Sequence, residues 1–422
     1  MSDVSFREAF KVWARIGLLS FGGPAGQIAL MHREIIDERH WLDEKEYLTA
    51  LNFCMLLPGP EAQQLAIYAG WRLHGIKGGL AAGLLFVIPG AFVVLGLSML
   101  YGAFGQVPLI NALFFGIKAA VLAIVVEALL RVARRSLKGK VEWLVAGLAF
   151  VALFCFNAPF PAVVIAAALY GFLRGSREPE QHSGELPGLG SIFATASLWL
   201  VVWLLPLAAL AALLGPEHIF SQIGIFFSKL SVVTFGGAYA VLSYMAQASV
   251  EQKHWLSGPE MIDGLGLAET TPGPLILVTE YVGYLAALRA TGSIWGGIAG
   301  ALVTLWMTFA PCFLWVFTGA PYIAAIGKRP RLAGALAMIT AAVVGVILNL
   351  TIWFGLHVLF GTVERMEGVF KPWLPDFHSL NPWALALSLV AALALLKLHL
   401  GLLKTLGICA GLGLVLRLSG VA

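Results

Sequence analysis

The chain has 422 residues and carries little charge. Only 12% of its residues are Asp, Glu, Lys or Arg, whereas 59% are hydrophobic. A typical soluble domain has about a quarter charged residues, so a water-soluble fold of this length could not hide so much apolar surface, and we expect lipid around it. The apolar runs are long and do not alternate, which favours membrane-spanning helices of about 20 residues over the strands of an outer-membrane barrel.

Signals for metal, nucleotide or covalent chemistry are also missing. The four cysteines form no CxxC motif and no Cys/His cluster, which argues against a disulfide framework or a zinc site. The sequence contains no P-loop, no Rossmann glycine pattern and no nucleophile elbow. We therefore expect no metal, no cofactor and no enzyme activity. The net charge of +4 is not interpreted as a nucleic-acid signal, because its distribution among loops matters more in a membrane protein. The first residues carry basic side chains but no small-residue cleavage site, so we interpret them as part of a retained first span.

What the sequence does contain is an internal duplication. Three motifs recur at one offset of 214 residues, and 12 of the 40 positions from 21 to 60 are identical to their partners. The motifs are Phe21-Gly22-Gly23 with Phe235-Gly236-Gly237, His40-Trp41-Leu42 with His254-Trp255-Leu256, and Pro58-Gly59-Pro60 with Pro272-Gly273-Pro274. We therefore divide the chain into a first repeat over 1–174, a polar linker with one linking span over 175–215, and a second repeat over 216–422.

Basic residues predict opposite orientations for the two repeats. The helix near 108–130 ends in a basic cluster over 131–140, whereas its partner near 332–355 begins after basic residues at 328–331. Because basic loops face the cytoplasm, the same helix would run inward in one repeat and outward in the other, as in an inverted repeat. We expect an all-α protein of about thirteen spans with the N-terminus inside and the C-terminus outside. The expected spans lie near 5–31, 47–70, 78–101, 108–130, 141–157, 159–173, 191–214, 219–248, 261–288, 293–319, 332–356, 381–397 and 400–418. The short spans at 159–173 and 400–418 could instead be re-entrant.

Helix breakers lie at matching places in the two repeats. Each Pro-Gly-Pro lies near the middle of an apolar span, where proline removes a backbone donor and glycine relaxes the backbone, so we expect the helix to stop and restart there. Phe-Gly-Gly should act similarly in the first span of each repeat. One such break alone is more often a packing kink. Broken helices at matching places in inverted halves instead favour a substrate site at the membrane midplane.

The predicted site has the polarity of an anion site. The half-helices that begin after Pro60 and Pro274 would direct their N-termini, with free N–H groups and positive dipole ends, at the centre. Amide and hydroxyl side chains nearby would add donors for a compact oxyanion, without a metal. Glu61 would compete with that anion if it caps its half-helix. The predicted substrate-binding residues are both pairs of tripeptides, Phe21, Gly22, Gly23, Phe235, Gly236, Gly237, Pro58, Gly59, Pro60, Pro272, Gly273 and Pro274, with Gln27, Asn52, Gln63, Gln64, Thr270 and Thr271.

Charged residues within or beside spans supply the remaining candidates. Arg33 and Lys118 are the first choices for the fixed positive charge that an anion carrier needs. Proton coupling needs a titratable acid in a low-dielectric site, for which Glu127, Glu269 and Glu280 are candidates. Each has a plainer alternative: Arg33 could be a side chain that snorkels to the interface, and Lys118 and Glu127 could belong to a structural ion pair.

The motifs together resemble the chromate transporter family. The first half carries SFGGPAGQIALMHREII, RHWLDEKEYL and LLPGPEAQQLAIYAGWRLHGIKGG with FVIPGAF, and the second half repeats them as TFGGAYAVLSYM, KHWLSGPEM, TTPGPLILVTEYVGY and TFAPCFLWVF. The likeness covers almost the whole chain. It implies a multi-pass protein of the bacterial inner membrane that exports chromate, a tetrahedral dianion, and confers chromate resistance. It also implies dependence on the proton gradient or the membrane potential.

Two alternatives stay open beside chromate export. Sulfate has the charge and shape of chromate, so a carrier or channel for sulfate or another oxyanion is the second hypothesis. A membrane-embedded enzyme or a non-transporting scaffold is the third, and it predicts catalytic side chains clustered at one membrane face and no flux. Because Gln247 lies opposite Arg33, and Leu277 lies opposite Gln63, we expect the first half to supply most polar contacts. The sequence is also compatible with a homodimer.

Overall fold

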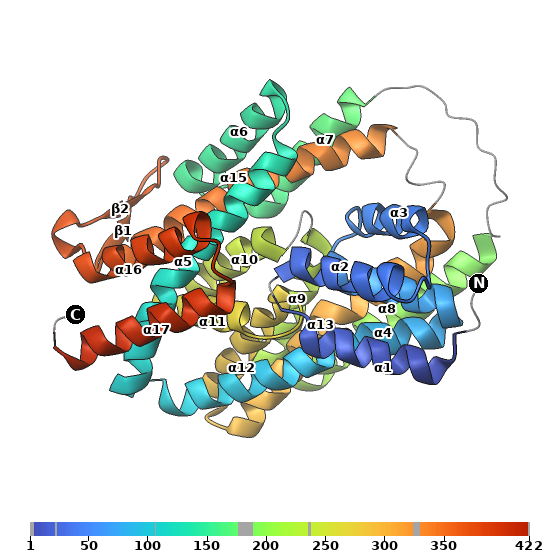
Figure 1. Cartoon of the computed structure of the whole chain (residues 1–422), viewed down its shortest axis with the longest axis horizontal. Coiled ribbons are helices and arrows are strands. Elements are labelled where there is room, and N and C mark those ends of the chain that lie inside the picture. Colours follow the sequence, from blue (N-terminus) through green and yellow to red (C-terminus); the bar gives the residue numbers. More distant parts are fainter. Residues whose placement is uncertain are drawn as a thin grey trace. The chain divides into compact units, whose positions relative to one another are not determined.

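A computed structural model describes residues 4–21, 23–105, 107–175, 189–234, 238–323 and 330–420 of the chain. These residues are almost entirely helical, in agreement with the all-α expectation (Figure 1). The exception is a short antiparallel pair of strands, β1 (Val363–Arg365) and β2 (Trp373–Pro375), in which Arg365 lies opposite Trp373. The chain divides into two compact units, and each unit contains segments from both predicted repeats.

Unit 1 comprises Met1–Met99, Arg174–Val241 and Thr271–Ala333. Helix α13 packs against α8, α9 and α12 within this unit. The first segment contains α1 (Phe6–Leu19), α2 (Gly23–His32), the π-helical turn η1 (Arg33–Asp37), α3 (Glu44–Cys54) and most of α4 (Glu61–Phe104). The later segments contribute α8 (Leu189–Leu214), α9 (Ile219–Val233), η3 (Leu275–Leu277), α12 (Val278–Thr291), α13 (Ile294–Gly319) and η4 (Ala320–Tyr322).

Unit 2 comprises Leu100–Leu173, Leu242–Thr270 and Gly334–Ala422. Helix α5 is its centre and packs against α11, α16 and α17. The approach to α17 is so close that a Cβ on Gly116 would lie 1.9 Å from the carbonyl oxygen of Cys409. Its elements are α5 (Pro108–Ser136), α6 (Lys140–Phe156), α7 (Phe160–Arg174), the end of α10 (Ala238–Gln247), η2 (Ala248–Gln252), α11 (Gly258–Thr270), most of α15 (Pro330–Leu359), β1, β2, η5 (Phe377–Ser379), α16 (Pro382–Ala392), η6 (Leu393–Lys397) and α17 (Leu402–Leu418).

Several described helices are long and apolar enough to cross a bilayer. Five meet this test by length and composition: Glu61–Phe104, Pro108–Ser136, Ile192–Leu214, Ile294–Gly319 and Ala333–Leu359. Shorter apolar helices occupy Phe160–Arg174, Ile219–Val233 and Pro382–Lys397. Helix α4 is interrupted at His74 and Gly75, where the backbone leaves the helical region, so it consists of two helical segments that meet at a kink. The number of spans and the inversion of the second repeat stay predictions.

The predicted helix interruptions are confirmed. At the first Pro-Gly-Pro, α3 ends at Cys54 and α4 begins at Glu61; at the second, α11 ends at Thr270 and helical structure resumes at Leu275. Helix α1 likewise ends just before the first Phe-Gly-Gly, and α9 ends just before the second. Gly22 and residues 235–237 lie outside the described residues, as does most of the polar linker.

One unusual helix ending also recurs at the repeat offset. His40 and His254 both have φ +52°, a region that non-glycine residues rarely occupy. The next residue in each case, Trp41 or Trp255, donates its backbone N–H to a carbonyl six residues earlier, at 2.8 and 2.9 Å. A cation then lies over each indole ring, Arg39 at 5.8 Å and Lys253 at 5.9 Å from the ring centroid. The two halves therefore share local backbone geometry as well as sequence.

Candidate functional site

The two Pro-Gly-Pro corners lie in unit 1, and each is hydrogen-bonded to the opposite half of the sequence. The N–H of Gly59 donates to the carbonyl of Thr234 at 2.8 Å, and the N–H of Gly273 donates to the carbonyl of Ser20 at 2.8 Å. Ser20 and Thr234 are partners at the 214-residue offset and are the C-caps of α1 and α9. Both hydroxyls donate four residues back, to Ile16 at 2.7 Å and Leu230 at 2.6 Å. The two backbone bonds are therefore reciprocal: the corner of each half donates to the residue that caps the first helix of the other half.

The corners need glycine because their backbone is left-handed and closely packed. Gly59 has φ +120° and Gly273 has φ +92°. A Cβ on Gly59 would lie 2.7 Å from the Gln64 amide nitrogen and 3.1 Å from Cys312 Sγ. At the second corner, a Cβ on Gly90 would lie 2.3 Å from the Pro272 carbonyl oxygen. Gly90 and Cys312 are sequence partners at the offset of 222 residues, so each corner also packs on the third span of the opposite half.

Three buried glutamines surround the corners. Gln27 donates from Nε2 to the carbonyl of Gly273 at 2.6 Å, and Gln64 donates to the carbonyl of Pro58 at 2.7 Å. Within the part of the chain that the structure describes, both Oε1 atoms are left without a hydrogen-bond partner. Among the described residues, Gln63 has no hydrogen-bond partner for Oε1 or Nε2. An unsatisfied buried amide costs about 1–3 kcal/mol, so this group needs a solute or water to complete it.

The donors available to an anion at this site are amides rather than cations. In the described part of the chain, no lysine or arginine is among the buried polar side chains. The Nε2 group of Gln63 and the first N–H groups of α4 supply donors, because the first turn of a helix has no intrahelical acceptors. The free Oε1 atoms of Gln27 and Gln64 require a donor in return, such as water or a hydroxyl of the solute. Among the described residues, no group of three His, Cys, Asp or Glu could hold a metal ion.

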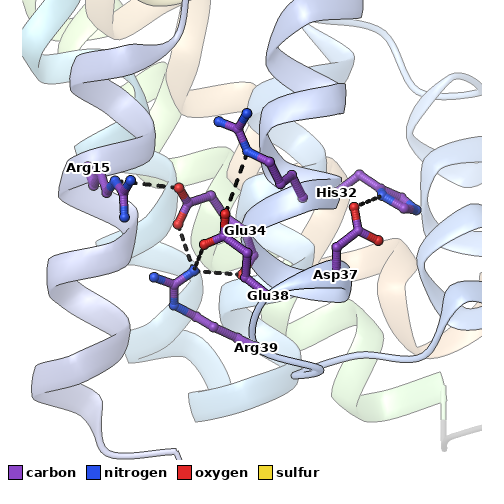
Figure 2. A network of polar contacts seen from close by, with 7 residues as sticks. Arg15, His32, Glu34, Asp37, Glu38 and Arg39 are labelled. Atoms are coloured by element: carbon purple, nitrogen blue, oxygen red, sulfur yellow. Dashed lines mark hydrogen bonds and ion pairs between the residues drawn. The ribbon is translucent and has the colours of Figure 1, made fainter.

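Arg33 lies apart from this buried group. Its side chain is 58% exposed, and its Nε lies 3.8 Å from Glu38. The charged network that follows α2 instead centres on Glu34, which is buried between Arg15 at 3.5 Å and Arg39 at 2.7 Å (Figure 2). This exposure favours the alternative interpretation, in which the Arg33 side chain extends to the membrane interface.

Lys118 and Glu127 lie in unit 2 and are both paired. Lys118 Nζ lies 3.0 Å from Asp263 Oδ1, and the hydroxyl of Tyr101 donates to Asp263 Oδ2 at 2.7 Å. Glu127 is paired with Arg131 one turn later on α5. The two residues thus belong to separate ion pairs. Sequence reasoning missed Asp263, although a carboxylate inside an apolar span was a signal that could have found it.

The other two acids are buried. Glu280 lies in the first turn of α12 in unit 1 and is 1% exposed, and no described residue forms a hydrogen bond with its Oε2. Glu269 is also buried, but it lies on α11 in unit 2.

The remaining predicted residues differ in their surroundings. Thr271, Gly59, Pro60 and the second Pro-Gly-Pro are buried, whereas Phe21 and Asn52 are exposed. Thr270 donates its hydroxyl to the Leu267 carbonyl at 2.8 Å within α11, so that donor is already used. The buried predicted residues of unit 1 are therefore Gly59, Pro60 and the second Pro-Gly-Pro, with Gln27, Gln63, Gln64 and Thr271.

Comparison with known proteins places both sequence halves in one family. The sequence pattern described as Chromate transporter matches residues 7–172 and 221–414. A chromate transport protein of Pseudomonas aeruginosa is 31% identical over 350 residues, which cover 82% of this chain and 80% of that protein. A chromate transport protein of Cupriavidus metallidurans is 28% identical over 81% of each chain. A probable chromate transport protein of Synechococcus elongatus is 28% identical over 83% of this chain and 85% of that protein. No solved structure matches the chain significantly.

These matches agree with the long apolar helices and with the resemblance of the motifs. A multi-pass membrane protein is the class that both observations support. Because the family pattern covers most of the sequence, the chain belongs to the chromate transporter family.

Proposed function

We propose that the chain carries chromate across the membrane, with the two Pro-Gly-Pro corners of unit 1 as its substrate site. The observation that carries this proposal is the reciprocal pair of hydrogen bonds from Gly59 to Thr234 and from Gly273 to Ser20. These bonds hold two helix interruptions of opposite sequence halves in one unit. Relatives at 28–31% identity are named for chromate transport, which favours this oxyanion as the substrate.

The site suits a compact oxyanion that sheds most of its water. The N–H groups at the start of α4 and the amide of Gln63 offer donors in a buried place, where a hydrogen bond to an anion is stronger than in water. The unpaired Oε1 atoms of Gln27 and Gln64 accept from retained water or from the hydroxyl of a protonated oxyanion. Because no buried cation would hold the anion, its affinity would stay low enough for release.

We propose export as the direction, from the cytoplasm of a bacterium across its inner membrane, with chromate resistance as the consequence. An inside-negative potential is worth about 2.3 kcal/mol per elementary charge per 100 mV and drives a dianion outward. Potential alone can therefore supply the driving force. A proton gradient would act through Glu280, a buried acid of unit 1 whose Oε2 has no hydrogen-bond partner among the described residues and which forms no ion pair with an arginine there, unlike Glu34.

Sulfate is the second candidate substrate. It has the charge and tetrahedral shape of chromate, and amide donors alone do not separate the two ions. It differs in holding no proton at neutral pH, so unfilled acceptor oxygens favour chromate, part of which is protonated there.

Flux in proteoliposomes tests the proposal. Purified protein is reconstituted, a potassium gradient with valinomycin sets the potential, and chromate movement is followed by its absorbance, with sulfate as competitor. We expect chromate to move toward the positive side, faster as the potential grows. Absence of chromate flux at every potential and pH would remove the proposal, and flux abolished by equimolar sulfate would favour the second candidate.

A further inference from the structure

Unit 2 contains a cavity that the proposed transport site does not use. Its volume is about 230 Å³, large enough for one tetrahedral oxyanion with water. Helices α5, α15, α16 and α17 contribute to its wall. The polar side chains that line it are Lys118, His357, Ser379, Asn381 and Arg417.

The charge of this cavity is positive by one unit. Lys118 is neutralised by Asp263 at 3.0 Å. Arg417 lies over the ring of Phe115, 5.0 Å from its centroid, and no carboxylate among the described residues is paired with it. An aromatic face orients a guanidinium but leaves its N–H groups available. The cavity therefore matches a monovalent anion better than a dianion.

The hydrogen-bonding groups in the wall are of both kinds. Asn381 uses its Oδ1 to accept from the N–H groups of Trp383 and Ala384, both at 3.0 Å, which leaves its Nδ2 hydrogens as donors. His357 Nδ1 lies 2.8 Å from the Trp353 carbonyl oxygen, so Nδ1 carries the hydrogen. In the neutral ring Nε2 is then an acceptor. The rings of Trp353 and Trp373, with centroids at 4.5 and 5.3 Å, hold the imidazole in this orientation.

We infer that this cavity binds a protonated tetrahedral monoanion of the phosphate type. Its oxygens accept from Arg417, Lys118 and Asn381, and its hydroxyl donates to His357 Nε2. Dihydrogen phosphate, dihydrogen arsenate and hydrogen chromate belong to this class, whereas sulfate has no hydroxyl to donate. A bare anion would also face the lone pair of Nε2, which is repulsive. The site is separate from the corners of unit 1.

Equilibrium binding tests the inference without any transport measurement. Full-length protein in nanodiscs of zwitterionic lipid is titrated with radiolabelled inorganic phosphate and, separately, with radiolabelled sulfate at neutral pH. We expect phosphate to bind at least about ten-fold more tightly than sulfate, because an acceptor left unpaired costs that much or more. Equal affinity for the two ions would overturn the inference.

Variants locate the site. Arg417→Gln should weaken phosphate binding by about ten-fold or more, whereas Arg417→Lys keeps the charge and should stay within about three-fold. His357→Phe should lower phosphate affinity to that of sulfate. The matched control is Arg134→Gln, an exposed arginine in the last turn of α5, which should leave binding unchanged. Phosphate binding unaffected by both Arg417→Gln and His357→Phe would overturn the assignment.

Two further arms separate this site from others. Gln63→Leu, in unit 1, should leave the part of phosphate binding that Arg417→Gln removes as in the wild type even if chromate flux is lost, so failure of transport and failure of this inference are distinguishable. A lipid phosphomonoester has the same chemistry as free phosphate. If phosphatidic acid in the nanodisc displaces the label, the headgroup also occupies the site; if it does not, the site takes the free ion only. Elution and melting temperature of each variant show that it is folded.

Discussion

At the scale of single residues, substitutions of the two glutamines beside the first corner can distinguish a role in substrate binding from a role in stability. Gln64 and Gln63 are neighbours on α4 and are both fully buried, but only Gln64 has a hydrogen bond, to the Pro58 carbonyl. Neither the oxygen nor the nitrogen of the Gln63 amide has a hydrogen-bond partner among the residues that the structure describes. The structure thus offers two nearly identical substitutions with different expected consequences.

Gln63→Leu should lower chromate flux by about ten-fold or more while leaving the melting temperature unchanged or higher, since replacing an unsatisfied buried amide by an apolar group of similar size removes a cost. Gln64→Leu should lower the stability by about 1–3 kcal/mol as well, because it orphans the Pro58 carbonyl. Flux and thermal unfolding in detergent measure the two effects. Wild-type flux in Gln63→Leu would show that its amide does not face the solute.

Glu280 is the residue where proton coupling is expected. Glu280→Gln keeps the shape and removes the titratable proton, so flux driven by potential should persist while the dependence of flux on pH is lost. The control is Glu8→Gln on the exposed face of α1, which should behave as the wild type. An unchanged pH profile in Glu280→Gln would assign coupling elsewhere or leave the potential as the sole driving force.

His32, at the end of α2, gives stability its own pH dependence. Burial alone would lower the pKa of His32, but its hydrogen bonds and charge interactions with Glu44 at 2.7 Å and Asp37 at 3.3 Å outweigh that effect and raise the pKa. A raised pKa in the folded state stabilises the protein below the unfolded value and loses this effect as pH rises through the folded value. His32→Gln should therefore be less stable than the wild type near pH about 5, and the two should converge near pH about 9. Parallel melting curves at every pH would contradict this.

At the scale of elements, the sequence predicted where helices break but not what the breaks bind. Proline and glycine act on their own backbone, so the ends of α3, α9 and α11 followed from the motifs. The acceptors for Gly59 and Gly273 are backbone carbonyls, which carry no mark in the side-chain sequence. The pair of Lys118 and Asp263 lies 145 residues apart and also depends on tertiary packing. The hairpin of β1 and β2 was not expected, because three-residue strands leave no periodic pattern.

Substitution of the corner glycines should disturb these elements. Gly59→Ala and Gly273→Ala should each lower stability by about 1–3 kcal/mol and reduce flux, because a positive φ and a close neighbour both oppose a Cβ. Gly96→Ala in α4 is the matched control, since nothing lies within 4 Å of its Cβ position, and it should raise stability by up to about 1 kcal/mol. Thermal unfolding of the three variants compares them. Equal melting temperatures in all three would mean that the corners tolerate a side chain.

At the scale of the whole molecule, orientation in the membrane stays a prediction that reporters can test. The sequence predicts about thirteen spans, with the N-terminus in the cytoplasm and the C-terminus outside. A green fluorescent protein fused at the N-terminus should fluoresce, and alkaline phosphatase fused at the C-terminus should be active. If the phosphatase is expressed in full but inactive, the chain has an even number of spans. In that case α7 or α17 would be a re-entrant helix that does not cross the membrane.

The exchange of hydrogen bonds between Ser20 and Gly273, and between Thr234 and Gly59, has a consequence for inheritance. Each half of the gene encodes one corner and also the backbone carbonyl that accepts a hydrogen bond from the corner of the other half. Loss of that carbonyl position from one half would therefore destabilise the corner of the other half. The side chains of the two halves have diverged, as Gln63 and its partner Leu277 show. The backbone hydrogen bonds between the halves do not depend on those side chains, so they keep each half dependent on the other. We expect the halves, if expressed as separate polypeptides, to accumulate only when both are made in the same cell.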